Sequence, residues 1–236
     1  MYSKFLKRIL DIICAILALV LFGWLYVIIA ILVKCKLGSP ILFSQIRPGK
    51  KDDKGVERLF RLYKFRTMTN EKDEKGDLLP DVIRLTKFGK WLRSTSLDEL
   101  PEVLNILKGD MSLIGPRPQL VRDMVFMTKE QRKRHNVRPG LSGLAQVRGR
   151  NAIGWEQKLS TDLEYVKHIS LWNDFKIVIQ TVKQVVCREG ITEEGEATAT
   201  DFGVYLRNNG LVSKEEFDEK MESAKKIVRD FENGCP

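Results

Sequence analysis

The sequence predicts an α+β protein: an N-terminal membrane helix of re-entrant topology, then a mostly helical cytosolic domain with a small β-hairpin and interfacial amphipathic helices. Three observations predict this: a long apolar run near the N-terminus, strand and turn patterns over residues 37–68, and helical patterns between residues 83 and 188. The length of 236 residues suffices for one domain with its own core plus a membrane segment. We expect a membrane-inserted helix at 1–36, the main domain at 37–200 and a polar tail at 201–236.

The apolar run Ile9–Val33 is the most hydrophobic stretch of the chain, and Asp11 is its only formal charge. At about 1.5 Å per residue, it is long enough to cross the roughly 30 Å hydrocarbon core of a bilayer. A secretory signal peptide is the alternative. The run is longer than a typical signal h-region, and no small-x-small cleavage site ends it. We therefore expect the segment to stay in the membrane.

Basic residues lie on both sides of the apolar run: Lys4, Lys7 and Arg8 before it, and Lys34 and Lys36 after it. Membrane proteins keep Lys and Arg on the cytoplasmic side, and here both flanks qualify. A helix that breaks near Gly23 and returns to the same face would satisfy both flanks. An ordinary span with a weak charge bias is the other possibility. The flanks alone do not choose between them.

Residues 37–68 alternate in a way typical of β-structure. Gly38-Ser39-Pro40 predicts a turn, and Ile41-Leu42-Phe43 a strand. Arg47-Pro48-Gly49 and the charged run Lys50–Arg58 predict a solvated hairpin loop. Leu59–Phe65 alternates enough to be the returning strand.

Most of the remaining chain predicts helices and rigid loops. Helices are expected at 83–93, 97–108 and 129–136, with a mobile polar loop at 71–81 and rigid Gly/Pro loops at 115–118 and 138–140. Residues 156–188 predict one or two amphipathic helices whose broad apolar surface lies either in the core or on lipid. Residues 213–232 predict a solvated helix.

The net charge of +9 implies anionic partners: phosphates, nucleic acid or an anionic membrane surface. Composition alone does not say which. The four cysteines form no CxxC pair, and His135 and His168 lack metal-ligand spacing. We expect a reducing compartment, no disulfide framework and no zinc site.

The acidic pair Asp98-Glu99 follows Ser96 and precedes Pro101. A purely structural interpretation is a helix start, because Ser96 and Glu99 have capping-box spacing and early acids suit the helix dipole. The functional interpretation uses the same geometry: a carboxylate at a positive helix end can attack phosphorus or hold a metal. Adjacent helical side chains point about 100° apart, so the two acids would have different roles.

A set of basic residues accompanies the acidic pair, and four of its members lie in Gly/Pro-rich segments. Arg is suited to bidentate phosphate contacts, although a solvated surface is the usual place for Lys and Arg. Both interpretations remain open from pattern alone. The set comprises Lys64, Arg66, Arg93, Arg117, Arg138, Arg148 and Arg150.

Four motifs resemble one family, the monotopic phosphoglycosyl transferases, the small "bacterial sugar transferase" enzymes that start glycan assembly on undecaprenyl phosphate. The resemblance covers about residues 1–200, its motifs are long and specific, and the chain resembles the minimal form. The matching segments are Tyr63-Lys64-Phe65-Arg66-Thr67-Met68, Ser96-Leu97-Asp98-Glu99-Leu100-Pro101, Leu104 to Pro118 (LNILKGDMSLIGPRP), and Val137 to Val147 (VRPGLSGLAQV).

The resemblance implies a two-step, ping-pong reaction. Asp98 is then the nucleophile that attacks the sugar-bearing phosphate of a UDP-sugar and displaces UMP. Polyprenyl (undecaprenyl) phosphate then attacks the aspartyl-phosphosugar. The resemblance also implies Mg²⁺ as the cofactor, with Glu99 and Asp98 as its ligands. Such enzymes lie in the bacterial inner membrane, catalytic domain on the cytoplasmic face, and begin glycoconjugate and polysaccharide biosynthesis.

The resemblance implies substrate-phosphate contacts at Arg93 and Arg117, with Lys64 at another basic position of the motifs that we also expect to bind phosphate, and Arg150 is expected to help hold the nucleotide. A carboxylate can approach a diphosphate only if cations screen the negative charge, which agrees with this assignment. The stretch Glu189–Gly195 resembles enzymes that use UDP-linked N-acetylated amino sugars, such as di-N-acetylbacillosamine.

The chain departs from the family where a Ser-Pro pair kinks the membrane helix, because Gly23-Trp24 stands there. Gly permits a bend but does not enforce one as Pro does. Two other classes of protein fit part of the pattern. A membrane-tethered basic nucleic-acid-binding protein fits the charge but lacks a recognition motif and interleaved aromatics. A membrane scaffold would not need the compact Asp-Glu and Gly-Pro-Arg-Pro pattern.

Overall fold

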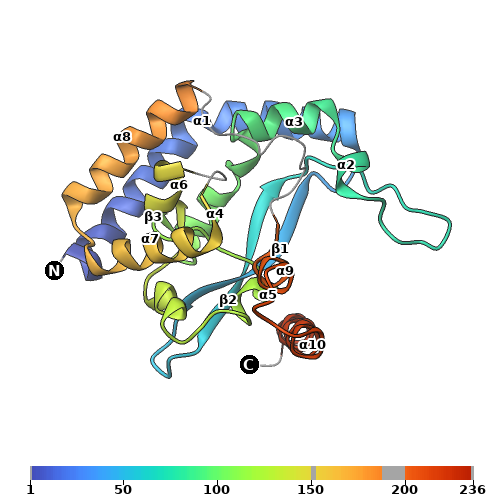
Figure 1. The fold of residues 1–236 in the computed structure, drawn as a ribbon. Coiled ribbons are helices and arrows are strands. Elements are labelled where there is room, and N and C mark those ends of the chain that lie inside the picture. Colours follow the sequence, from blue (N-terminus) through green and yellow to red (C-terminus); the bar gives the residue numbers. More distant parts are fainter. Residues whose placement is uncertain (1, 150–152, 188–199, 235–236) are drawn as a thin grey trace.

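The computed structural model describes residues 2–149, 153–187 and 200–234 (Figure 1). Helices predominate and surround one long β-hairpin. Along the chain the elements are a π-helical turn Tyr2–Leu6, α1 Lys7–Leu37, β1 Leu42–Lys51, β2 Glu57–Phe65, α2 Asp81–Arg84, α3 Lys87–Ser94, a 3-10 turn Leu97–Glu99, α4 Glu102–Lys108, β3 Ser112–Ile114, α5 Val121–Met124, a 3-10 turn Gln131–Asn136, β4 Gly140–Ser142, α6 Leu144–Gly149, α7 Trp155–Lys167, α8 Leu171–Cys187, α9 Phe202–Asn208 and α10 Lys214–Glu232.

The N-terminal helix α1 has 31 residues and is long and apolar enough to cross a membrane. It changes direction part-way along its length (Figure 1). The expected break at Gly23 does not occur as a loss of helix, because helical structure continues through this residue. The indole nitrogen of Trp24 donates to the carbonyl of Leu21 at 2.9 Å.

Both ends of α1 pack against the rest of the protein, whereas its middle is exposed. Ala15 joins a core cluster with Ile106, and Val33 joins another with Phe65. Asp11, the one acid of the apolar run, is buried. It accepts hydrogen bonds from the Ser112 hydroxyl at 3.0 Å and the backbone N–H of Leu113 at 2.9 Å. Its charge is therefore satisfied by the folded domain.

The predicted hairpin is present, but its first strand is longer than expected. β1 pairs antiparallel with β2 from Leu42↔Phe65 to Lys51↔Glu57, with an irregularity between Pro48 and Lys51. Arg47-Pro48-Gly49, expected in the loop, therefore lies within the strand. Pro48 is fully buried, and a Cβ on Gly49 would come within 2.9 Å of the Arg58 carbonyl. Tertiary packing overrides the turn propensity of this Pro-Gly pair.

A second, parallel pair joins β3 to β4 through Ser112↔Gly140 and Ile114↔Ser142. The sequence predicted a loop at 138–140, where β4 begins, and no element at 112–114. Gly115 and Gly140 explain the difference, because a Cβ on either would lie 2.8 Å or less from the other's backbone. Each strand is too short to produce a pattern of its own.

The predicted helices exist with altered limits. Residues 83–93 are divided between α2 and α3, and 97–108 between a 3-10 turn and α4. The 129–136 prediction corresponds to a 3-10 turn, and 156–188 to α7 and α8. The predicted C-terminal helix is α10, which Ser213 caps by accepting from the Glu216 N–H. Ala224 of α10 is buried in a core cluster with Val121 and Met124 of α5 and Ile46 of β1, so this helix is not solvated on all sides.

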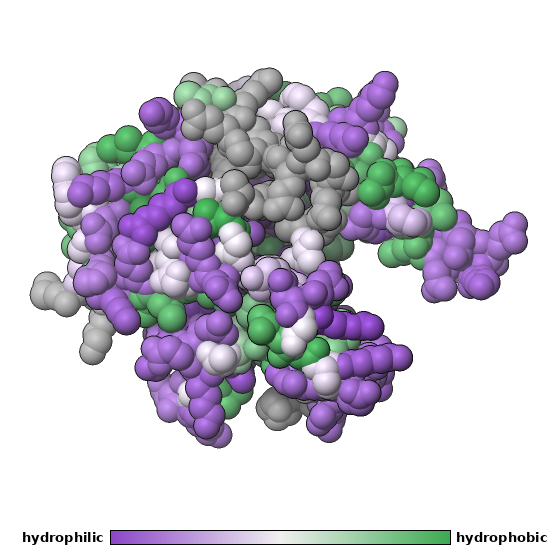
Figure 2. Space-filling view, viewed as in Figure 1, coloured by the Kyte–Doolittle hydropathy of each residue, from purple (hydrophilic) through white to green (hydrophobic). Residues whose placement is uncertain are grey.

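Large apolar side chains are exposed mainly on α1, α8 and α2. Figure 2 shows a hydrophobic area over α2 beside the mostly hydrophilic tip of the 71–80 segment. On α8, Ile177 is buried in the core, but most other apolar side chains are exposed. The exposed apolar residues of α8 are Leu171, Trp172, Phe175, Val178, Ile179 and Val182; those of α2 are Val82 and Ile83.

Candidate active site

The acidic pair lies on the 3-10 turn between α3 and α4. Ser96 precedes it in the left-handed conformation, with φ 55° and ψ 17°, and its side chain caps nothing. The capping-box prediction is therefore wrong: the Ser96 carbonyl, rather than its hydroxyl, accepts the Glu99 N–H. Left-handed non-glycine residues are strained and persist where surrounding structure holds them, often at functional sites. Pro101 is the N-cap of α4, a place where proline is tolerated.

Glu99 is the centre of an ion-pair cluster. Its Oε1 lies 2.7 Å from Lys64 Nζ on β2 and 2.9 Å from Arg117 Nη2 in the loop after β3. Burial alone would raise the pKa of Glu99, but Lys64 and Arg117 outweigh it and hold the pKa well below its usual range. Glu99 therefore carries a fixed negative charge at neutral pH.

A third carboxylate, Glu102, was not singled out from the sequence. It is buried, and its Oε1 lies 3.1 Å from Lys64 Nζ. Burial raises its pKa to about 7, although Lys64 opposes the shift. Its three-residue spacing from Glu99 was the available clue, because that spacing places both acids on the same side of a helical turn.

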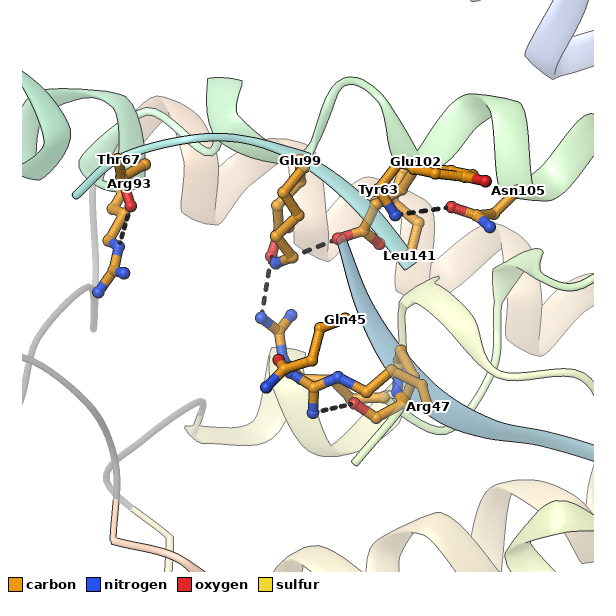
Figure 3. Close-up of polar contacts among 12 residues, drawn as sticks. Gln45, Arg47, Tyr63, Thr67, Arg93, Glu99, Glu102, Asn105 and Leu141 are labelled. Carbon is orange, nitrogen blue, oxygen red and sulfur yellow. Dashed lines mark hydrogen bonds and ion pairs between the residues drawn. The ribbon is translucent and has the colours of Figure 1, made fainter. Parts of the chain in front are cut away.

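Asp98 differs from Glu99 in the direction in which its surroundings shift its pKa. It is buried, and burial raises its pKa to about 6, against the opposing charges of Lys64 and Arg93. The Nε of Arg93 donates to the Thr67 hydroxyl at 3.1 Å. Figure 3 shows Arg93 and Thr67 on one side of Glu99, with Glu102 and Asn105 on the other. At pH 7 Asp98 is mostly ionised and only weakly neutralised, which suits a nucleophile.

Asn105 holds the strand that carries Lys64, and nothing in the pattern pointed to this residue beyond its place in a motif. Its side-chain oxygen accepts the Tyr63 N–H at 3.1 Å, and its side-chain nitrogen donates to the Arg61 carbonyl at 2.7 Å. The buried amide thus pairs with the free edge of β2 as a neighbouring strand would. These two hydrogen bonds join α4 to β2 and so hold Lys64 in position beside the carboxylates.

The other predicted phosphate-binding candidates do not join this cluster. Arg66 donates to the carbonyls of Leu37 and Ser39 at the end of α1. Arg138 donates to the Gly109 carbonyl at 2.7 Å, and Arg148 pairs with Glu164. These three are structural. Arg150 lies outside the described residues.

The donor set suits Mg²⁺ in part. Among the described residues no group of three or more His, Cys, Asp and Glu side chains is placed to hold a metal ion. Mg²⁺, however, commonly binds one or two carboxylates and takes its other ligands from substrate phosphates and water. Asp98 and Glu99 supply two hard carboxylates on one turn, and the hydrogen bonds that Lys64 and Arg117 donate to Glu99 are both made to its Oε1.

The sequence comparisons define the class. The chain matches the family described as bacterial sugar transferase over residues 2–188. A Bacillus subtilis (strain 168) protein described as "Uncharacterized sugar transferase EpsL" is 47% identical over 197 residues, which cover 84% of this chain and 95% of that protein. A Caulobacter vibrioides "UDP-glucose:undecaprenyl-phosphate glucose-1-phosphate transferase" is 39% identical over 76% of this chain and 69% of its own length.

An Aeromonas hydrophila "UDP-N-acetylgalactosamine-undecaprenyl-phosphate N-acetylgalactosaminephosphotransferase" is 39% identical over 77% of this chain, which spans only 44% of that longer protein. The membrane helix, the paired carboxylates and these matches define an enzyme, a phosphoglycosyl transferase. The chain belongs to the bacterial sugar transferase family.

Proposed function

We propose that this enzyme transfers a phosphosugar from a UDP-sugar to polyprenyl (undecaprenyl) phosphate, releases UMP, and so initiates bacterial glycoconjugate assembly. The observation that carries the proposal is the cluster of Asp98, Glu99, Lys64 and Arg117, which joins a buried carboxylate to cations that suit a diphosphate. Relatives named for undecaprenyl-phosphate sugar phosphotransfer support the reaction class. A panel of UDP-sugars with undecaprenyl phosphate, read as UMP release, tests it.

The proposed mechanism has two displacements at phosphorus. In the first, a carboxylate oxygen of Asp98 bonds to the sugar-bearing phosphorus, and the bond from that phosphorus to the bridging oxygen breaks, so UMP leaves with the electron pair. In the second, an oxygen of the lipid phosphate attacks the same phosphorus, and the Asp98 carboxylate leaves. Lys64, Arg93 and Arg117 stabilise the charge that develops in both steps. Mg²⁺ held by Asp98 and Glu99 would supply further charge neutralisation when bound.

The proposed position in the membrane rests on α1. A straight membrane span would meet the domain at one end only, yet Asp11 and Ala15 near one end and Ile29 and Val33 near the other are all buried. A re-entrant helix, both ends at the cytoplasmic face, accounts for this and for the basic flanks. The indole of Trp24 donates a hydrogen bond to the backbone carbonyl of Leu21. Such a donor stabilises a carbonyl in lipid, where no water is present to bond it. The exposed apolar side chains of α8 and α2 would lie at the membrane interface.

Cysteine labelling tests the topology. In a variant that lacks the native cysteines, Ser3→Cys and Lys36→Cys each place one thiol beside an end of α1, where both side chains are exposed. We expect a membrane-impermeant maleimide to label both from the cytoplasmic face of inverted vesicles and neither from intact spheroplasts. Labelling from opposite faces would establish a simple span instead.

Arg117→Lys tests phosphate anchoring. The neighbouring prolines restrain the Arg117 backbone, and its guanidinium already donates to Glu99. Lys keeps the charge but loses the planar fork, so we expect turnover to fall at least about tenfold, or about 1.4 kcal/mol of barrier. Arg61→Lys is the matched control, because Arg61 lies on β2 and pairs loosely with Glu232 at the surface. Wild-type turnover in Arg117→Lys would assign Arg117 a structural role.

The sugar is proposed only as a class, a UDP-linked N-acetylated amino sugar such as di-N-acetylbacillosamine. The stretch that suggested it, 189–195, lies outside the described residues. The donor panel decides this. If no UDP-sugar releases UMP while duplex or single-stranded nucleic acid binds tightly, the membrane-tethered nucleic-acid-binding alternative holds.

A further inference from the structure

Arg47 on β1 lies at the edge of the ion-pair cluster, and the sequence pattern had placed it in a solvated loop. Its Nη2 donates to Gln45 Oε1 at 2.7 Å, and its Nη1 donates to the Pro118 carbonyl at 3.3 Å. Because Pro118 follows Arg117 directly, Arg47 contacts the loop that carries Arg117. Figure 3 shows Arg47 and Gln45 together, on the opposite side of Glu99 from the α4 backbone.

Both hydrogen-bond acceptors of Arg47 are uncharged. Among the residues that the structure describes, no carboxylate lies within ion-pair distance of it, and its Nε is buried without a hydrogen-bond partner. The two acids that act on it at longer range have other partners. Glu102 pairs with Lys64, and Asp123 accepts backbone N–H groups of Leu120 and Phe202.

The positive charge of Arg117 makes it energetically unfavourable to bury the Arg47 guanidinium without a bound anion. Burial and the positive charge of Arg117 lower the pKa of Arg47 to about 10. A partly buried guanidinium is normally paired, since removing its charge from water is expensive. Here one of two adjacent guanidiniums, Arg117, is paired with Glu99, and the other, Arg47, has no counter-ion in the part of the chain that the structure describes.

We propose that Arg47, aimed by Gln45, is a second guanidinium contact for the diphosphate of the donor, beside Arg117. The proposal rests on the proposed function, because that function brings a nucleoside diphosphate to this cluster. Arg47 on β1 and Arg117 in the loop after β3 then both bind phosphate oxygens. Asp98 stays free to attack the phosphorus. The two hydrogen bonds to Gln45 and Pro118 leave further N–H donors of the guanidinium for such oxygens.

The test measures binding of UMP and of inorganic pyrophosphate to the full chain in detergent micelles by calorimetry, apart from turnover. We expect Arg47→Gln to weaken both at least about tenfold and Arg47→Lys to fall in between. Arg58→Gln makes the same change at an exposed residue of the same hairpin and should leave both affinities unchanged. Thermal unfolding identifies any variant that has lost its fold. If Arg47→Gln does not fold, the affinities of Arg47→Lys for UMP and pyrophosphate decide whether Arg47 binds phosphate.

Wild-type affinity for both ligands in a folded Arg47→Gln variant would overturn the proposal. Wild-type protein that binds pyrophosphate but not UMP would reject the nucleotide substrate, and the pyrophosphate arm would still decide the role of Arg47. If the wild type binds neither ligand, both proposals fail.

Discussion

Asp98→Asn is expected to abolish UMP release from any UDP-sugar while leaving the fold intact. Asn is nearly isosteric but lacks the attacking carboxylate oxygen, so the first displacement cannot start. Because burial raises the pKa of Asp98 to about 6, the Asp98 carboxylate, although mostly ionised at pH 7, costs the folded protein stability relative to the unfolded chain. The neutral Asn should therefore not lower the free energy of unfolding.

Intact mass after incubation with UDP-sugar, without lipid acceptor, is the sharper measurement. The wild type should gain one phosphosugar, mapped to the peptide that contains Asp98, and Asp98→Asn should gain none. Asp53→Asn makes the same change on the exposed hairpin turn and should behave as wild type. Turnover by Asp98→Asn, or UMP release only when both substrates are present, would instead favour direct in-line attack by the lipid phosphate.

Lys64→Met is expected to lower the free energy of unfolding by about 3–5 kcal/mol and to remove activity. Lys64 lies between Glu99 at 2.7 Å and Glu102 at 3.1 Å, and all three side chains are largely buried. Removing it leaves two carboxylates near each other with only Arg117 to offset them. Urea unfolding in detergent micelles measures the loss, and Lys90→Met on the exposed face of α3 is the control.

Two further measurements test the cause of this loss. The pKa of Glu102 is already raised to about 7, and it should rise further without Lys64. A raised folded-state pKa makes the ionised acid destabilising above that pKa, so the loss should be larger at pH 8 than at pH 5. Adding Glu102→Gln to Lys64→Met should restore part of the stability. An equal loss at both pH values would contradict the charge explanation and point to packing.

The acidic pair and part of its cationic surroundings were predictable, and the reason is local. Asp98 and Glu99 are adjacent, the matching motifs contain Lys64 and Arg117, and Arg93 lies three residues before the motif that begins at Ser96. Two residues near this cluster, Glu102 and Arg47, were missed for the opposite reason. Glu102 looks like an ordinary acid in the first turn of a helix. Arg47 stands in an Arg-Pro-Gly run typical of a loop, and only the buried pairing of β1 with β2 turns it toward Arg117.

The predicted basic set shows that a sequence pattern does not distinguish phosphate-binding arginines from structural ones. Arg66, Arg138 and Arg148 have the same residue type as Arg117 and belong to the same predicted basic set. Their guanidiniums instead satisfy backbone carbonyls or a surface acid. Which unpaired group a long side chain reaches depends on the three-dimensional neighbours, and no spacing in the sequence records those.

The sequence by itself determined the features that depend on local composition and short-range order: an apolar helix with basic flanks, a β-hairpin, the helical stretches and the Asp98-Glu99 turn. Tertiary structure decided the features that depend on long-range contacts. It placed Asp11 against β3 and made Arg47 part of strand β1. It also brought Lys64 and Arg117, which are 53 residues apart in the chain, within hydrogen-bond distance of Glu99. The physical reason is that burial of a shared apolar core decides which distant segments meet. A charged side chain that is buried in this way must then pair with an oppositely charged or polar group beside it, because an unpaired buried charge is costly.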